Sequence, residues 1–338
     1  MKTEYKKEIQ IDTLKLVTEI KYFSEPNKNL FKSKLNESTG EIESKEFNAK
    51  WWSDYPFALY IHMNALSGKL TMEFSSKLLL DDYPQLITID TLPLCLHNIV
   101  KYGICKLDIE SIIKNHYCSK IHITKDINMQ LTPEILNTMN MHVENYRRYS
   151  WQRYENNAIL FKKNVETRGA QEEIIVYNKE KEISLPKNKA FLAKLSNPEV
   201  VLEYFKGKTR FEMKYEGKKK IKKGLKIENT SLQDIMQAEQ NPLLNQFDKI
   251  FTAEKKDVVP DFLINNIITY GQFNILRFHN GNLKKIEQEM KDMGLYKNSS
   301  RGAMGKQMKK MSHLLHSLNN QSMNADDIIE GIRQKLKN

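Results

Sequence analysis

The chain has 338 residues, which is enough for one large domain and a smaller one. Its formal net charge of +11, from 53 basic and 42 acidic residues, favours a polyanionic partner such as nucleic acid, although only eight of the basic residues are arginine and such a composition is also typical of an AT-rich gene. Its three cysteines form no CxxC pair and no run of about 18 apolar residues occurs, so we expect a soluble intracellular protein without disulfides, a zinc site or a membrane span.

The first part of the chain predicts strands. Residues 24–50 are polar and predict a surface loop or an extended insertion after an N-terminal strand. Apolar and polar residues then alternate with the period of a β-strand over 59–64 and again over 70–75. Ser67 and Gly68 lie between these runs, so the pattern predicts a hairpin with one face in water.

The period changes to a helical one over residues 86–115. This segment predicts two helical pieces, with Pro93 near the start and Gly103 between them. The next strand is expected at 119–128, with isoleucines on one face and polar residues on the other. Thr132 is a suitable cap for the helix expected after it, because a proline follows at the first helical position.

Three further strands are expected. Apolar runs at 158–163 and 172–179 predict the first two, and the second would carry a tyrosine and a lysine two residues apart on one strand face. A short helical segment from Pro186 should precede the third strand, at 208–216. That strand alternates cleanly between apolar and charged residues.

Helices dominate the rest of the chain. The lysines at 218–223 predict a solvated loop, and we expect domains at 1–250 and 251–338. Within the second, residues 281–294 and a helix from about Ser300 carry methionine-bearing apolar stripes and predict a hairpin of helix-turn-helix proportions. The expected fold class is therefore α+β, with a central antiparallel sheet, crossover helices and a C-terminal helical domain.

Several of the expected strands place a charged or polar side chain on the face away from the core. These residues are Glu73, His122, Asp126, Tyr177, Lys179, Arg210 and Glu212. They would converge if the strands share one antiparallel sheet. Acids without a nearby cysteine suit a hard ion such as Mg²⁺ or Mn²⁺, which would polarise a phosphodiester. A tyrosine beside the ion could attack phosphorus and hold the cleaved strand covalently.

Each of these residues also has a purely structural interpretation. Tyr177 is one of 15 tyrosines, and a strand tyrosine more often packs with its hydroxyl in water. Glu212 can form a cross-strand ion pair, Asp126 can be a turn acceptor, and His122 is more often a hydrogen-bonded surface histidine. No GxGxxG, GxxxxGK[ST], HExxH or GxSxG motif occurs, so nucleotide hydrolysis is not expected.

Five segments follow one another in a familiar order. They read "LTMEFSSKLLL", "IHITKDI", "IIVYNKEKEI", "RFEMKYE" and "NNIITYGQFNILRFHNGNLKKIEQEMKDMGLYKNSS". This order, over residues 55–310, resembles the phage and plasmid replication initiators of the filamentous-phage gene II type. The resemblance implies an enzyme that nicks one strand at a double-strand origin, becomes joined to the 5′ end, and leaves a 3′-OH that primes rolling-circle synthesis.

The resemblance also implies roles for individual residues. The family's tyrosine in its Tyr-x-Lys strand falls on Tyr177, and the acid of its Arg-x-Glu strand falls on Glu212. The strand usually written Asp-x-Thr-x-Asp has His122 in the first acidic position and Asp126 in the second. Either the imidazole is a metal ligand, or the two acids hold the ion together with Glu73.

Two basic residues complete the expected catalytic set. A phenol has a pKa of about 10, so its attack at neutral pH needs a nearby cation or metal. Lys179 and Arg210 are suitably basic, and they could alternatively grip phosphate.

The implied partners are origin DNA, double-stranded with a single-stranded nick site, and the host helicase and polymerase in the cytoplasm of a bacterial cell; a homodimer stays open. The residues expected to contact DNA are Lys218, Lys219, Lys220, Lys222, Lys223, Arg301, Lys306, Lys309 and Lys310. The competing function is a non-catalytic DNA-binding protein, such as a repressor or origin-binding factor, whose C-terminal helices bind. An RNA-binding module is less favoured because no strand has an aromatic-rich RNP sequence.

Overall fold

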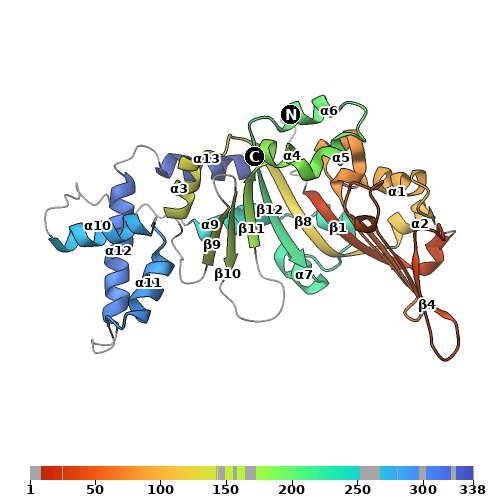
Figure 1. Cartoon of the computed structure of the whole chain (residues 1–338), viewed down its shortest axis with the longest axis horizontal. Coiled ribbons are helices and arrows are strands. Elements are labelled where there is room, and N and C mark those ends of the chain that lie inside the picture. Colours follow the sequence, from red (N-terminus) through yellow and green to blue (C-terminus); the bar gives the residue numbers. More distant parts are fainter. Residues whose placement is uncertain are drawn as a thin grey trace. The chain divides into compact units, whose positions relative to one another are not determined.

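The computed structural model has mixed α and β structure with a large antiparallel sheet (Figure 1). It describes residues 9–24, 26–141, 143, 149–154, 158–163, 173–251, 267–279, 281–296, 302–320 and 325–337. The chain forms two compact units, one of Met1–Gln130 with Tyr177–Leu243 and one of Leu131–Val176 with Leu244–Asn338. The expected division into domains at residue 250 stays a prediction.

Antiparallel strands form the sheet of the first unit in the order β3-β4-β5-β6-β1-β8-β12, with the end of β11 beside β12. Their bounds are β1 Gln10–Glu19, β3 Lys32–Leu35, β4 Ile42–Asn48, β5 Leu59–Asn64, β6 Lys69–Ser75, β8 Tyr117–Asn128, β11 Glu173–Asn178 and β12 Lys208–Glu216. Two short strands, β2 Phe23–Ser24 and β7 Lys106–Leu107, pair separately. The predicted hairpin is confirmed, since β5 pairs antiparallel with β6.

The helices of the first unit are short. They are α1 Leu92–Lys101, α2 Ile109–Lys114, α4 Lys179–Ile183, α5 Lys189–Leu192, α6 Pro198–Phe205, α7 Lys218–Leu225 and α8 Leu232–Met236. Turns of 3₁₀ helix occur at Ile20–Tyr22, Ala49–Trp51, Ser76–Gln85 and Pro186–Asn188. The two helical pieces predicted within 86–115 are confirmed by α1 and α2.

Helices cover both faces of strands β8 and β12. Tyr215 of β12 and Ile121 of β8 are buried on one face, where Gly224 of α7 lies against the Tyr215 ring. The guanidinium of Arg210 is on the other face, under the Phe205 ring of α6. Helices α4, α5 and α6 lie together in Figure 1. The charged face of strand β12 is therefore buried at Arg210 and Glu212.

Residues 24–50, expected as a surface loop or an extended insertion, contain the exposed strand β3 and the partly buried strand β4, and Phe31 and Phe47 pack together with ring centroids 5.8 Å apart. Two local predictions are wrong. The lysine run at 218–223 lies in helix α7, which Ile221 anchors in the core. Lys179 begins helix α4 instead of continuing the strand, because the Asn178 side chain accepts a hydrogen bond from a backbone N–H of that helix.

The second unit contains strands β9 Tyr149–Tyr154 and β10 Ala158–Lys163, which pair antiparallel, and most of β11. Its helices are α3 Pro133–Met141, α10 Ile267–Phe278, α11 Leu283–Asp292, α12 Ala303–Asn320 and α13 Ala325–Lys337, together with most of α9 Pro242–Ile250. The predicted Thr132 cap is confirmed, since its Oγ1 accepts a hydrogen bond from the N–H of Ile135 at 3.3 Å. Across the described residues, no helix is both long enough and apolar enough to cross a bilayer.

The predicted apolar stripes of α11 and α12 form a shared core. Its buried members include Leu283, Ile286, Met290, Met308 and Met311. Met293, expected on the same stripe, is 63% exposed because α11 ends one residue before it. The predicted packing of these methionines is therefore confirmed, except for Met293 at the end of the first stripe.

Gly224 provides a test of the packing between α7 and β12. A Cβ built at this position would lie 2.3 Å from Cε1 of the buried Tyr215 ring. Overpacking costs about 1–3 kcal/mol, whereas alanine gains about 1 kcal/mol of helix propensity over glycine. We expect Gly224→Ala to lower the free energy of unfolding by up to about 2 kcal/mol in urea denaturation, and the exposed Lys223→Ala to leave it nearly unchanged. If Gly224→Ala were more stable than the parent, the Tyr215 ring would have to move aside at little cost, which would contradict this expectation.

Candidate active site

A buried arginine lies at the centre of the first unit's polar site. Pairing of β12 with β8 places Arg210 opposite Asp126, and the Nε and Nη2 atoms of Arg210 donate to the two oxygens of Asp126, each at 2.7 Å. Its Nη1 donates to Oδ1 of Asp12, also at 2.7 Å. The side chain is fully buried, so two carboxylates neutralise one guanidinium. Arg210 is thereby positioned as a clamp between β1 and β8.

Asp12 belongs to this site but was not among the predicted residues. The register between β1 and β8 shifts between Ile11 and Thr13, so Asp12 lies at a β-bulge, a feature that redirects side chains. The Oγ of Ser76 donates to it at 2.9 Å. Burial opposes ionisation, but Arg210, Lys179, the Ser76 hydrogen bond and His122 together outweigh it and lower the pKa of Asp12 below its usual value.

The sequence contains a signal for this bulge. Buried residues occupy odd positions at Ile9, just before β1, and at Ile11, and then even positions at Leu14 and Leu16. In a regular strand the buried positions stay two apart, so the change of phase indicates an extra residue between them. The phase change therefore indicates a bulge at Asp12 or Thr13.

Glu212 connects two of the predicted site residues. The Tyr177 hydroxyl donates to its Oε2 at 3.4 Å, and Nδ1 of His122 lies 3.0 Å from its Oε1. The other ring nitrogen of His122, Nε2, is buried and has no hydrogen-bond partner among the described residues. The structure therefore brings the expected nucleophile, one expected acid and the expected imidazole together.

The phenol of Tyr177 is not activated by its surroundings alone. Burial raises the pKa of Tyr177 well above its usual value, and the nearby Arg210 only partly opposes this effect. The hydroxyl is therefore protonated near neutral pH. Attack by this oxygen requires an acceptor for its proton, and the carboxylate of Glu212 is in position to be that acceptor.

Lys179 approaches the site from helix α4. Its side chain is 2% exposed, and Nζ donates to Oε2 of Glu182 at 2.5 Å. Nζ also lies 5.1–5.7 Å from the ring centroids of Tyr83, Phe205 and Tyr177. Burial lowers the pKa of Lys179, and Arg210 lowers it further. Tertiary packing, and not a shared strand face, brings this lysine to the tyrosine.

Glu182 should make the fold sensitive to acid. Burial opposes its ionisation, but Lys179, Lys77 and the Asn188 hydrogen bond together outweigh burial and lower the pKa of Glu182 from 4.5 to about 2. A lowered folded-state pKa means that the stabilisation is complete above pH 4.5 and is lost as the pH falls toward 2, with a slope of up to about 1.4 kcal/mol per pH unit. Glu182→Gln should flatten this decline in urea denaturation at several pH values. Glu203→Gln, at an exposed site, should keep the slope, and equal slopes for Glu182→Gln and the parent would contradict the expectation.

The four expected metal ligands do not form one cluster. The Arg210 guanidinium engages both oxygens of Asp126, and Glu73 lies in a separate ion-pair network with Lys120 at 2.8 Å and Lys15 at 3.3 Å. Within the part of the chain that the structure describes, no three His, Cys, Asp or Glu side chains are arranged to hold a metal ion. The residues thus fit a divalent ion only in part, through His122 and Glu212.

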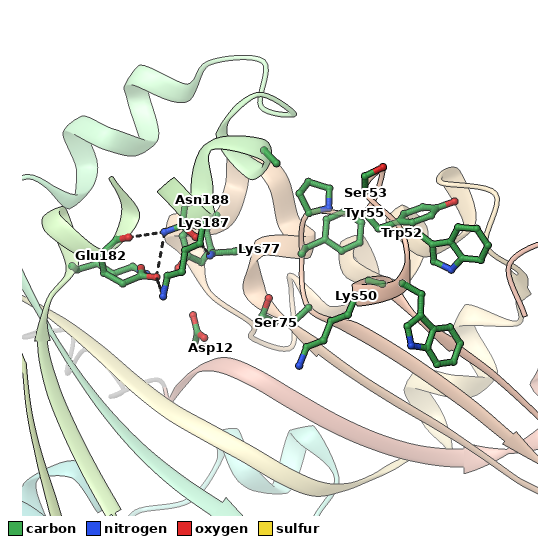
Figure 2. A pocket seen from close by; sticks show the side chains of 18 of the residues that line it. Asp12, Lys50, Trp52, Ser53, Tyr55, Ser75, Lys77, Glu182, Lys187 and Asn188 are labelled. Atoms are coloured by element: carbon green, nitrogen blue, oxygen red, sulfur yellow. Dashed lines mark hydrogen bonds and ion pairs between the residues drawn. The ribbon is translucent and has the colours of Figure 1, made fainter. Parts of the chain in front are cut away.

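Tyr177 and Lys179 line a cleft of about 1120 Å³. Figure 2 shows charged and polar groups at one end, including Asp12 and Glu182, and the aromatic Trp52 and Tyr55 at the other. The remaining lining includes Lys50, Trp51, Ser53, Ser75, Lys77, Lys187 and Asn188. The aromatic wall was not predicted, although the concentration of rings in "WWSDYPF", residues 51–57, was visible in the sequence.

The lysines expected to contact DNA lie on two helices, one in each unit. On α7, Lys218, Lys219, Lys222 and Lys223 are exposed and Lys220 is half-buried. On α12, Lys306, Lys309 and Lys310 are exposed beside the buried methionines. Arg301 lies outside the described residues. Both helices present cations that a phosphate backbone could contact.

Known proteins add no assignment to this geometry. No protein-family model matches the chain, and a search of curated proteins found no match. Function therefore has to be argued from the arrangement of residues in the cleft.

Proposed function

We propose that the chain is a replication initiator that nicks one strand of origin DNA with Tyr177 as nucleophile, giving a 5′-phosphotyrosyl link and a 3′-OH primer for rolling-circle synthesis. The observation that carries the proposal is the position of the Tyr177 phenol, which lines a cleft and donates a hydrogen bond to Glu212. A nucleophile needs an adjacent proton acceptor and an open approach for its substrate. Both features are present at Tyr177.

The cleavage step follows from these contacts. The Tyr177 oxygen forms a bond to phosphorus, the bond from phosphorus to the 3′ oxygen breaks, and the phenolic proton passes to Glu212. The leaving 3′ oxygen takes a proton from water. Lys179, whose charge lies beside the tyrosine ring, would stabilise the charge that develops on the phosphate. Reversal of the step rejoins the strand, which makes the enzyme a nickase and a ligase.

Mg²⁺ or Mn²⁺ is part of the proposal. The free Nε2 of His122 would be one ligand of the ion; Glu212 now contacts Nδ1 of the same ring, so it would join the ion only if that ring turned, and Asp126 and Glu73 would first have to leave their present ion pairs. A bound ion of this kind polarises a phosphodiester. Arg210 has its guanidinium committed to Asp12 and Asp126, so its part in the proposed chemistry is to position these acids.

The proposal also extends to partners and cell location. The fold would be that of a replication-initiator nickase with a helical domain at 251–338, which binds DNA or dimerises. Duplex origin DNA would contact the lysines of α7 and α12, and a host helicase and polymerase would extend the primer. The protein would act in the cytoplasm of a bacterial cell.

The test uses supercoiled plasmid that carries the DNA adjoining the gene. Wild-type protein with Mg²⁺ or Mn²⁺ should give relaxed circles and protein-linked DNA, and EDTA should prevent both. Peptide mapping of the adduct should identify the fragment that contains Tyr177. Plasmid that is shifted in a gel but stays supercoiled would reject the nickase.

A DNA-binding protein without catalytic activity is the second candidate. The observation that favours it is the high pKa of the buried Tyr177, together with the engagement of Asp126 and Glu73 in ion pairs. In that case the sheet is a scaffold, and the exposed lysines carry the binding of a repressor or origin-binding factor. The plasmid experiment separates the two candidates, because only the nickase changes DNA topology.

A further inference from the structure

The aromatic end of the cleft is a rigid segment. In the 3₁₀ turn Ala49–Trp51, the Asn48 side chain accepts a hydrogen bond from the N–H of Lys50 at 3.1 Å, and the N–H of Trp52 donates to the carbonyl of Ala49 at 3.0 Å. Tyr55 packs edge-on against Phe47, with ring centroids 5.4 Å apart. The turn is thus closed by its own hydrogen bonds, and the segment after it packs back on β4.

Large rings remain accessible on this rigid segment. Trp51 is 37% exposed, and the ammonium of Lys32 lies 3.8 Å from the centre of its ring. Trp52 is half-buried and lines the cleft. Indole rings that are at least partly exposed on a hydrogen-bonded turn are suited to stack on flat ligands, because little backbone freedom is lost on binding.

The charges of the cleft complement a phosphate chain. Its lining has four lysines, namely Lys50, Lys77, Lys179 and Lys187, against two acids, Asp12 and Glu182. Lys179 and Lys187 are paired with Glu182. Lys50 is exposed and forms no ion pair with any described residue, and Lys77 donates to the Asn188 side chain. In Figure 2 Lys50 lies between the aromatic end and the charged end.

We propose that this cleft binds an unpaired DNA strand, whose bases stack on Trp51 and Trp52 while its phosphates contact Lys50 on the way to Tyr177. Bases expose their faces only when they are unpaired, and stacking on aromatic side chains with lysines along the backbone is how proteins hold single strands without reading sequence. The inference rests on the proposed function for its choice of DNA and for the direction toward Tyr177. Binding itself requires no cleavage.

Stacking can be measured with a fluorescent oligo-dT by anisotropy in EDTA. Trp51→Ala and Trp52→Ala should each weaken binding by roughly 5- to 100-fold, and Trp51→Phe and Trp52→Phe should recover part of the loss. Lys50→Ala should reduce the slope of log affinity against log salt by about 0.7, as for one phosphate contact on a single strand. Tyr204→Ala, at an exposed aromatic residue outside the cleft lining, should bind like the parent.

Three outcomes would overturn the inference. In the first, both tryptophan-to-alanine variants fold normally by circular dichroism and bind oligo-dT as tightly as the parent. In the second, these variants lose as much affinity for a hairpin duplex as for oligo-dT. In the third, the parent protein binds oligo-rU more tightly than oligo-dT. The last would assign the cleft to RNA. A wild-type protein that binds oligo-dT through its tryptophans but never nicks plasmid would contradict the proposed nickase and leave the proposed strand binding intact.

Discussion

Tyr177→Phe should abolish nicking, by a factor on the order of 1,000 or more, while affinity for oligo-dT stays within about twofold of the parent. The substitution removes one oxygen and keeps the ring that packs near Lys179. The hydrogen bond that is lost, to Glu212, is 3.4 Å long, so its loss should cost little stability. Conversion of supercoiled plasmid to relaxed circles, and the amount of protein-linked DNA, are the measurements.

Tyr60→Phe is the matched control for this experiment. The Tyr60 hydroxyl also donates to a glutamate, Glu46 at 3.2 Å, but it lies on β5 and does not line the cleft. Nicking by this variant should equal that of the parent. If Tyr177→Phe still forms the covalent adduct, another tyrosine is the nucleophile, and the cleft-lining Tyr55 and Tyr83 would be tested before Tyr215, which packs on the opposite face of the sheet.

Arg210→Met should lower the free energy of unfolding by about 3–5 kcal/mol. The guanidinium is fully buried and is the shared partner of two carboxylates, Asp12 and Asp126. Methionine fills much of the same volume but removes the cation that pairs with both acids, of which Asp126 is the more deeply buried, and removing one partner of a buried pair costs far more than the pair itself contributes. Urea denaturation followed by circular dichroism measures the effect.

Two further variants make the arginine experiment decisive. Lys120→Met removes a cation from the ion pair with Glu73, in which both side chains are about a quarter exposed, and should cost only about 0–1 kcal/mol. Adding Asp126→Asn to Arg210→Met should recover part of the lost stability, because it removes one of the stranded charges. A loss below about 1 kcal/mol for Arg210→Met would contradict the clamp.

Local sequence patterns were sufficient for most of the elements. The hairpin β5–β6 and strand β12 follow from alternation of side chains, which depends only on neighbouring residues. Helices α1, α3 and α11 follow from their apolar period and terminal residues. Glu212 and Tyr177 could be assigned to candidate strands for the same reason.

Tertiary structure alone decided how the site is assembled. Asp12 reaches Arg210 through a bulge that exists only where β1 pairs with β8, and Asp126 meets Arg210 only in the observed register of β8 and β12. Lys179 reaches Tyr177 because α4 turns away from the strand at Asn178 and packs under buried rings. The contacts of Arg210 with Asp12 and Asp126 join strands distant in sequence, so no local pattern records which partners meet, although the change of phase in β1 does indicate the bulge. The sequence therefore determined which residues could do chemistry, and the packing of separate elements determined which of them are already paired and which face the cleft.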